Sequence, residues 1–141
     1  ALRVVCRKGY AAIIVTNQRA VAKGLIRREA LEDLHARLRK VVEAEGLALL
    51  DIIYCPHEKG VCECRKPQPG MLLQMARKHG LDLAASWMSG DAETDVQAGR
   101  SAGCRTILVN SAPASVSADR QIASMRELPE LLENVLSIPC A

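Results

Sequence analysis

The sequence predicts an α/β fold built on a parallel sheet. Short apolar runs, typical of buried parallel strands, alternate along the chain with longer segments of helical periodicity. Glycine, proline or a polar pair ends most of these segments, and no internal repeat or low-complexity tract interrupts them. The expected strands lie at 11–16, 48–54, 86–90, 104–110 and 121–123, and the expected helices at 28–46, 70–79, 93–102 and 128–136.

The first half of the chain shows this alternation most clearly. Residues 11–16 read AAIIVT, a continuous apolar run that ends in a polar pair. Residues 28–46 repeat leucine and valine at helical spacing, and Gly46 favours the end of that helix. The apolar run at 48–54 then leads the chain into a loop that is rich in cysteine.

The second half repeats the pattern with shorter elements. Gly70 follows a proline and favours the start of a helix, and Gly80 favours its end. SWMSG at 86–90 reads as a strand that leads through a turn into the helix at 93–102. The segment 111–118 contains mainly small and polar residues, so a loop is expected there.

The composition is that of one globular domain over residues 1–141, with 49% hydrophobic residues, 25% charged residues and a net charge of +3. The chain has no Phe, one Trp and two Tyr, so it lacks the stacking platforms of single-strand binders. No apolar run is long enough to span a bilayer. We therefore expect neither nucleic acid nor membrane as a partner.

A loop at 55–64 gathers three of the six cysteines and one histidine, in the pattern Cys55-x-His57-x4-Cys62-x-Cys64. Three thiolates and one imidazole form a closed tetrahedral ligand set for zinc, with no position left for a substrate. A metal-free cysteine-rich loop or a redox site is the alternative. Such clustering indicates a reducing compartment, so we expect a cytoplasmic protein whose loop is stiffened by the metal.

The other three cysteines are scattered. Cys6 and Cys104 lie in apolar contexts, where a small buried residue is expected, and Cys140 stands near the end of the chain.

Arg65 and Lys66 follow the cysteine loop directly, and Pro67 stiffens their other side. A lysine held in this way can neutralise charge on a transferring phosphoryl group. An arginine can bind a second phosphate or a sugar hydroxyl through two donors. The alternative is an ordinary solvated basic pair.

Polar side chains follow two of the predicted strands. Thr16 and Asn17 stand at the carboxyl end of the first strand, where ligands bind in open α/β sheets; an Asx turn is the alternative. Asp91 and Asp95 follow the strand at 86–90, with a spacing that places both on one helical face. Paired carboxylates suit Mg²⁺, although N-capping by Asp91 is the alternative.

Together these motifs resemble the haloacid dehalogenase (HAD) superfamily of phosphohydrolases. Within it, VTNQ, CPHEKGVCECRKPQPGML and SGDAETDVQAGRSAGCRTILV are similar to the heptose 1,7-bisphosphate 7-phosphatase family, whose loop carries a structural zinc. Histidinol-phosphate phosphatases share the cysteine loop and the Arg-Lys-Pro segment, but the continuation PQPGML favours the heptose family. The resemblance runs from about Leu2 to Leu136 and implies a HAD-like Rossmannoid fold, with three layers around one parallel sheet.

The resemblance also implies roles for individual residues. Thr16 and Lys66 would stabilise the phosphoryl group, Asn17 and Gln18 would line the phosphate and substrate pocket, Arg65 would help to select the substrate, Asp91 would bind Mg²⁺, and Asp95 would support the site by holding Lys66 or the backbone. Two departures stand out. Arg19 and Ala20 replace small polar residues of the family's TNQSG, and Ala92 stands where these phosphatases often carry lysine.

The family's first motif, an Asp-x-Asp on the first strand, supplies its nucleophile and its general acid/base. No Asp-x-Asp occurs in these 141 residues. We therefore expect a partial domain that lacks the first, central strand, begins within the following helix at ALRVVCRKGY, and is inactive alone. The loss would leave two half-sheets with unpaired inner edges, which would impair folding or recruit a substitute strand.

The function implied for the parent protein is Mg²⁺-dependent removal of the 7-phosphate from heptose 1,7-bisphosphate, in the synthesis of nucleotide-activated heptose for lipopolysaccharide. The implied cofactors are structural Zn²⁺ and catalytic Mg²⁺. The full-length protein is expected to be a monomer that binds a small sugar bisphosphate. Two alternatives remain, a histidinol-phosphate phosphatase and a non-catalytic zinc-containing paralogue that binds a phosphosugar.

Overall fold

A computed structural model describes residues 1–137, which form two compact units. The first unit contains residues 1–56 together with 129–137, and the second contains residues 57–128. The sequence predicts that the whole chain forms one domain, which would require these two units to associate. That stays a prediction.

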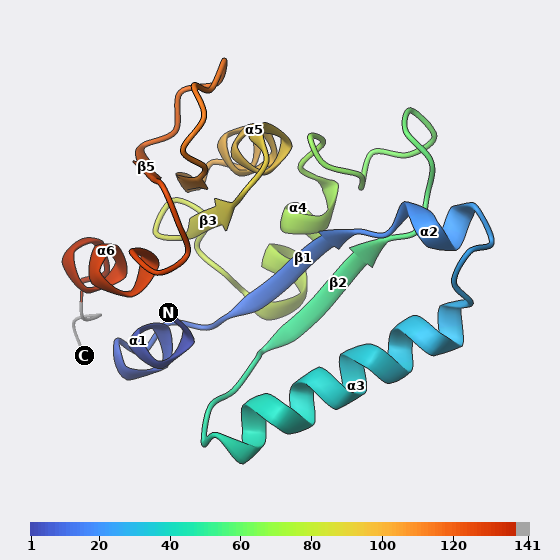
Figure 1. Cartoon of the computed structure of the whole chain (residues 1–141), viewed down its shortest axis with the longest axis horizontal. Coiled ribbons are helices and arrows are strands. Elements are labelled where there is room, and N and C mark those ends of the chain that lie inside the picture. Colours follow the sequence, from blue (N-terminus) through green and yellow to red (C-terminus); the bar gives the residue numbers. More distant parts are fainter. Residues whose placement is uncertain (138–141) are drawn as a thin grey trace. The chain divides into compact units, whose positions relative to one another are not determined.

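The first unit is built on two parallel strands, β1 (Ile13–Asn17) and β2 (Asp51–Cys55), which lie side by side in Figure 1. Ile13 pairs with Asp51 and Asn17 pairs with Cys55, so the two strands end together. The backbone N–H of Gln18 extends the ladder by donating to the carbonyl of Cys55 at 2.8 Å. The last residues of β1 therefore lie beside the start of the cysteine loop.

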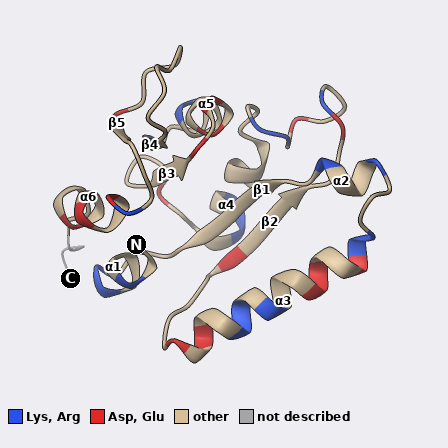
Figure 2. Cartoon of the chain, viewed as in Figure 1, with Lys and Arg blue, Asp and Glu red and all other residues tan. Residues whose placement is uncertain are grey.

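The long helix α3 (Arg28–Ala44) runs alongside β2 and is joined to it by polar and aromatic contacts. His35 packs against Tyr54 with ring centroids 5.5 Å apart, and Arg39 contacts Asp51 at 3.2 Å. Basic and acidic residues are interspersed along α3 (Figure 2), so this helix presents no surface of a single charge.

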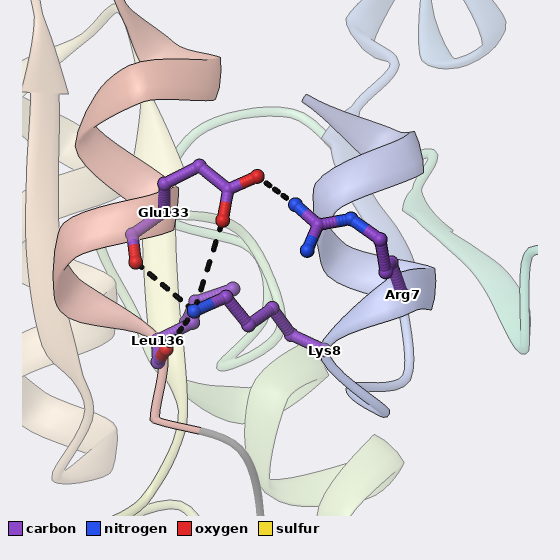
Figure 3. Close-up of polar contacts among 4 residues, drawn as sticks. All are labelled: Arg7, Lys8, Glu133 and Leu136. Carbon is purple, nitrogen blue, oxygen red and sulfur yellow. Dashed lines mark hydrogen bonds and ion pairs between the residues drawn. The ribbon is translucent and has the colours of Figure 1, made fainter.

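The helices α1 (Leu2–Arg7) and α6 (Leu128–Val135) meet through a lysine at the end of α1 (Figure 3). The ammonium of Lys8 donates to the carbonyls of Glu133 at 3.1 Å and Leu136 at 3.0 Å. The carboxylate of Glu133 also pairs with Arg7. Cations favour the carboxyl ends of helices, where carbonyls lack helical partners, so Lys8 stabilises the end of α6.

The second unit contains a parallel sheet in the order β3 (Trp87–Gly90), β4 (Arg105–Val109) and β5 (Arg120–Ile122). Gly90 pairs with Leu108, so the segments that follow β3 and β4 leave the sheet at the same edge. Asp119 links the residue before β5 to β4, because its carboxylate accepts hydrogen bonds from the amide and the hydroxyl of Thr106, at 2.7 and 2.8 Å.

The helices α4 (Gly70–His79) and α5 (Glu93–Ala102) contribute to the core of the second unit. Buried apolar residues come from both helices and from the strands: Met71, Met75, Met88, Val96, Ala98, Ala102, Ile107, Leu108 and Val109. A Cβ at Gly99 would lie 2.7 Å from Met88 Cβ and 2.9 Å from Thr106 Cγ2. Glycine in the middle of α5 therefore permits a close approach of the helix to the sheet.

The predicted class is confirmed, because the chain is an α/β protein with parallel sheets. Within residues 1–137 the strands form two sheets, β1–β2 and β3–β4–β5, as the sequence predicted. One short helix, α2 (Arg19–Ala22), was not predicted. No helix within residues 1–137 is both long and apolar enough to cross a membrane.

The expectation for the isolated cysteines is half correct. Cys104 is buried, as predicted. Cys6 is only half-buried, because α1 buries Val4 and not the position of Cys6, so that prediction was wrong. Cys140 lies outside the described residues.

Candidate metal loop and phosphate site

The structure brings the four predicted ligands of the cysteine loop together. The ligand atoms of Cys55, His57, Cys62 and Cys64 all lie within 4.8 Å of one another. Cys64 Sγ is 3.4 Å from His57 Nδ1 and 2.9 Å from Cys62 Sγ. Because three thiol sulfurs and one imidazole nitrogen converge, the donor set fits a tetrahedral zinc ion.

The metal loop, residues 55–64, is tied to the helix that follows it. The backbone N–H of Gly70 donates to the carbonyl of Glu63 at 3.1 Å. A Cβ at Gly70 would lie 2.3 Å from that oxygen, so only glycine lets the start of α4 approach the loop so closely. Arg65 adds a second link, since its guanidinium donates to the carbonyl of His57 at 3.2 Å.

Lys66 and Asp95 form a buried ion pair within the second unit. Lys66 Nζ lies 2.6 Å from Asp95 Oδ1, and the two side chains are 11% and 8% exposed. The second carboxylate oxygen of Asp95 accepts the backbone N–H of Ala92 at 3.2 Å. Breaking a buried pair leaves an uncompensated charge, so each partner fixes the position of the other.

Gly90 makes room for this pair. A Cβ at Gly90 would lie 2.1 Å from Asp95 Oδ2, which is too close for any side chain to be accommodated without displacing the carboxylate. Close packing therefore joins the end of β3, the start of α5 and Lys66. The sequence motif alone did not indicate this packing.

Asp91 is exposed in the turn between β3 and α5, at the carboxyl edge of the sheet. Asn110 Nδ2 lies 3.4 Å from the carbonyl of Asp91.

Glu93 accepts hydrogen bonds from the amide and the hydroxyl of Ser115, at 2.6 and 2.5 Å. These hydrogen bonds lower the pKa of the Glu93 carboxyl. Sequence reasoning missed Asn110 and Glu93, because their partners Asp91 and Ser115 lie 19 and 22 residues away along the chain and no motif marks the contacts.

The residues that follow β1 belong to the first unit. Gln18 Nε2 donates to Thr16 Oγ1 at 3.2 Å. Asn17 pairs with Cys55 in the sheet and is half-buried, whereas Arg19 is exposed. The predicted anion-binding residues thus lie at the edge of the sheet where β2 leads into the metal loop.

Comparison with known proteins agrees with these motifs. Residues 63–131 match the HAD-hydrolase-like family model. The chain is 41% identical over 105 residues to the D-glycero-beta-D-manno-heptose-1,7-bisphosphate 7-phosphatase of Pseudomonas aeruginosa, covering 73% of this chain and 58% of that protein. It is 34% identical over 143 residues to the enzyme of the same name from Photorhabdus laumondii, covering 92% of this chain and 76% of that one.

A solved structure shows the same relationship. The D,D-heptose 1,7-bisphosphate phosphatase from B. bronchiseptica, complexed with magnesium and phosphate, superimposes with a TM-score of 0.80 at 28% identity. The match covers 94% of this chain and 81% of that structure. Against the Pseudomonas aeruginosa relative, by contrast, the chain spans less than two thirds of the relative's length.

Proposed function

This chain belongs to the HAD-like family of heptose 1,7-bisphosphate 7-phosphatases, and on that premise we propose that its parent protein removes the 7-phosphate from a heptose 1,7-bisphosphate. The activity is that of a phosphoric monoester hydrolase. Its substrate would be a small sugar bisphosphate, in a cytoplasmic protein that acts as a monomer when full length. Support for the cytoplasmic location comes from the cysteine loop, whose thiols must stay reduced to bind a metal.

The observation that carries this proposal is the buried contact between Lys66 and Asp95, together with the position of Asp91 four residues before Asp95. Phosphoryl transfer depends mainly on positioning and on stabilising negative charge. A lysine held by a buried carboxylate needs no reorganisation to face the oxygens of a transferring phosphate. Thr16, Asn17 and Gln18 would donate to the same phosphate, as the family resemblance implies.

The metal loop would bind zinc through Cys55, His57, Cys62 and Cys64, and the ion would act structurally. All four positions of a tetrahedral zinc would be filled by protein, so no site for a substrate remains on it. What the loop contributes is rigidity: it connects directly to Arg65, Lys66 and α4. Arg65 is proposed to select the substrate, in addition to its observed contact with the loop.

Asp91 would hold Mg²⁺, which when bound offsets charge on the substrate phosphate. The carboxylate of Asp91 is exposed at the carboxyl edge of the sheet, where ligands bind in α/β folds. Asp95 would support the site rather than hold the ion itself, since its two oxygens contact Lys66 and the N–H of Ala92. The attacking carboxylate of the family's Asp-x-Asp motif is not among these 141 residues.

The test is release of inorganic phosphate by the full-length product of the gene that encodes this chain. We expect hydrolysis of both anomers of heptose 1,7-bisphosphate to exceed that of histidinol phosphate. The Lys66→Met variant should lower kcat by about 10²–10³, as the loss of a charge-stabilising donor does in other enzymes. Lys59→Met, which removes an exposed lysine of the metal loop, is the matched control and should be nearly silent.

Two results would contradict the proposal. Preferential hydrolysis of histidinol phosphate would assign the chain to the related specificity. Binding of the sugar bisphosphate without phosphate release would indicate a non-catalytic paralogue.

A further inference from the structure

The loop that follows β4 is fastened to the turn that carries Asp91. Asn110 is the first residue after β4, and its amide nitrogen lies 3.4 Å from the carbonyl of Asp91. The side-chain oxygen of Asn110 accepts the N–H of Ala112 at 2.8 Å, and Gln121 donates to the carbonyl of Asn110 at 2.7 Å. Asn110 is therefore held on both sides in the orientation that reaches Asp91.

Glu93 makes the second link, between the start of α5 and the loop 111–118. It is the first residue of α5, and both of its carboxylate oxygens accept hydrogen bonds from Ser115. Bonds of an ionised acceptor to an N–H and an O–H are stronger than those between neutral groups. Two turns further along α5, Arg100 donates to the carbonyl of Ser117 at 2.7 Å. The loop 111–118 is thereby anchored along α5, with Glu93 as the anchor nearest to Asp91.

Asp91 itself is exposed. Ala92 beside it is bonded to Asp95, since its N–H donates to the carboxylate at 3.2 Å and its carbonyl accepts the N–H of Asp95 at 2.9 Å. Both of these bonds lead into α5, whereas the bond from Asn110 ties the turn to the segment that follows β4. A carboxylate that must hold a cation binds more weakly if its backbone has to be ordered first, because that ordering costs conformational entropy.

From this geometry we infer that Asn110 and Glu93 are positioning residues, which orient the cation-binding carboxylate of Asp91 by clamping its turn to the loop 111–118. This inference rests on the proposed function, which gives Asp91 its role. Neither side chain needs to touch the metal or the substrate. Their effect acts through the backbone of the Asp91 turn.

The test is a titration of the full-length protein with Mn²⁺, used as a paramagnetic substitute for Mg²⁺ and followed by broadening of backbone amide signals near Asp91. Asp91→Asn should weaken Mn²⁺ binding at least tenfold. Asn110→Ala should weaken it about threefold to tenfold without altering the charge of the protein. Glu93→Ala should weaken it by a similar factor, and Glu93→Gln, which keeps one acceptor oxygen, should restore part of the affinity.

Glu127→Ala is the matched control, since Glu127 also caps a backbone amide, that of Ser124 at 3.0 Å, far along the chain from Asp91. It should leave the Mn²⁺ affinity within twofold of the original. If Asp91→Asn weakens binding but Asn110→Ala and Glu93→Ala do not, the inference is overturned while the proposed function stands.

A second readout separates the two claims if Asp91→Asn has no effect. Hydrogen exchange of the Ala92 amide should accelerate at least threefold in Asn110→Ala, whether or not Asp91 binds a cation. Unchanged exchange at Ala92 would overturn the clamp itself, whereas an unaffected Mn²⁺ affinity in Asp91→Asn would overturn only the proposed role of Asp91.

Discussion

The two units of the chain differ in how well they bury their own strands. In the second unit, β4 is buried from Thr106 to Val109, and Ile107 is fully inaccessible. In the first unit, every residue of β1 is only half-buried. Large apolar side chains of α3 are also exposed there, with Leu34 at 60% and Val41 at 63%.

This difference extends to the candidate site residues. Lys66 and Asp95 are held by burial and by the absence of a side chain at Gly90. Thr16, in contrast, is positioned by a half-buried strand and by one hydrogen bond from Gln18. The second unit thus preorganises its residues through its own packing, whereas the first unit relies less on a core and more on polar contacts at its surface.

The largest effect is expected from the metal loop. Cys62→Ala should lower the affinity for zinc by more than 100-fold, because structural zinc sites bind with about 10–16 kcal/mol and depend on all four ligands. Zinc content after dialysis against a chelator measures this. Cys6→Ala, which removes a half-buried thiol outside the loop, should retain one zinc per chain. Equal retention by both variants would show that the loop is not the zinc site.

The contrast in burial predicts unequal costs for the same truncation. Ile107→Ala should destabilise the second unit by about 2–5 kcal/mol, because it leaves a cavity in a closed core. Ile14→Ala in β1 should cost about 1–2 kcal/mol, because a half-buried side chain loses less transfer free energy. Urea unfolding of the two variants makes the comparison. Equal losses, or a larger loss for Ile14→Ala, would contradict the difference between the units.

Gly90→Ala tests whether packing at the end of β3 fixes the ion pair. The new methyl group would overlap Asp95 Oδ2 and shift the carboxylate, whose Oδ1 pairs with Lys66, with an expected cost of about 1–3 kcal/mol. Gly80→Ala is the control, since its Cβ would meet open space and its positive φ of 65° should cost about 1 kcal/mol. Thermal denaturation distinguishes the two, and a smaller loss for Gly90→Ala would refute the tight packing.

The smallest effect is expected at Asp119. Hydrogen bonds from the Thr106 hydroxyl and amide lower the pKa of this carboxyl below its ordinary value of 3.8. A lowered folded-state pKa adds stability that is complete above the unfolded-state value and is lost as pH falls through the folded-state value. Asp119→Asn should therefore flatten the acid side of the stability profile below about pH 4. A profile identical to that of the original chain would show that Asp119 adds no pH-dependent stability.

Much of the fold followed from local patterns in the sequence. The helix at 93–102 and the end of α4 at Gly80 were predicted at the observed residues, because caps and periodicity are local signals. The metal ligands could also be predicted from the sequence, since all four lie within ten consecutive residues. By contrast, β2 begins at Asp51 rather than at residue 48, and the four-residue helix α2 is too short to show a period.

The interactions that join distant segments could not be predicted in the same way. Nothing near Glu93 in the sequence indicates that Ser115 lies against it, and nothing near Asp91 indicates the amide of Asn110. Such contacts depend on where the tertiary fold places each loop, which local sequence patterns do not indicate. The roles of Thr16, Gln18 and Arg65 toward a substrate accordingly remain predictions.

The most direct test of the account is the ¹⁵N–¹H signal of the Lys66 ammonium in protein with and without zinc. A lysine held in a buried ion pair exchanges its protons slowly and is observable, whereas a solvated lysine is not. We predict a Lys66 signal in the zinc-loaded protein that disappears in Asp95→Asn and after the metal is chelated. A signal that persists unchanged once zinc has been removed would show that the metal loop does not hold Lys66 in place.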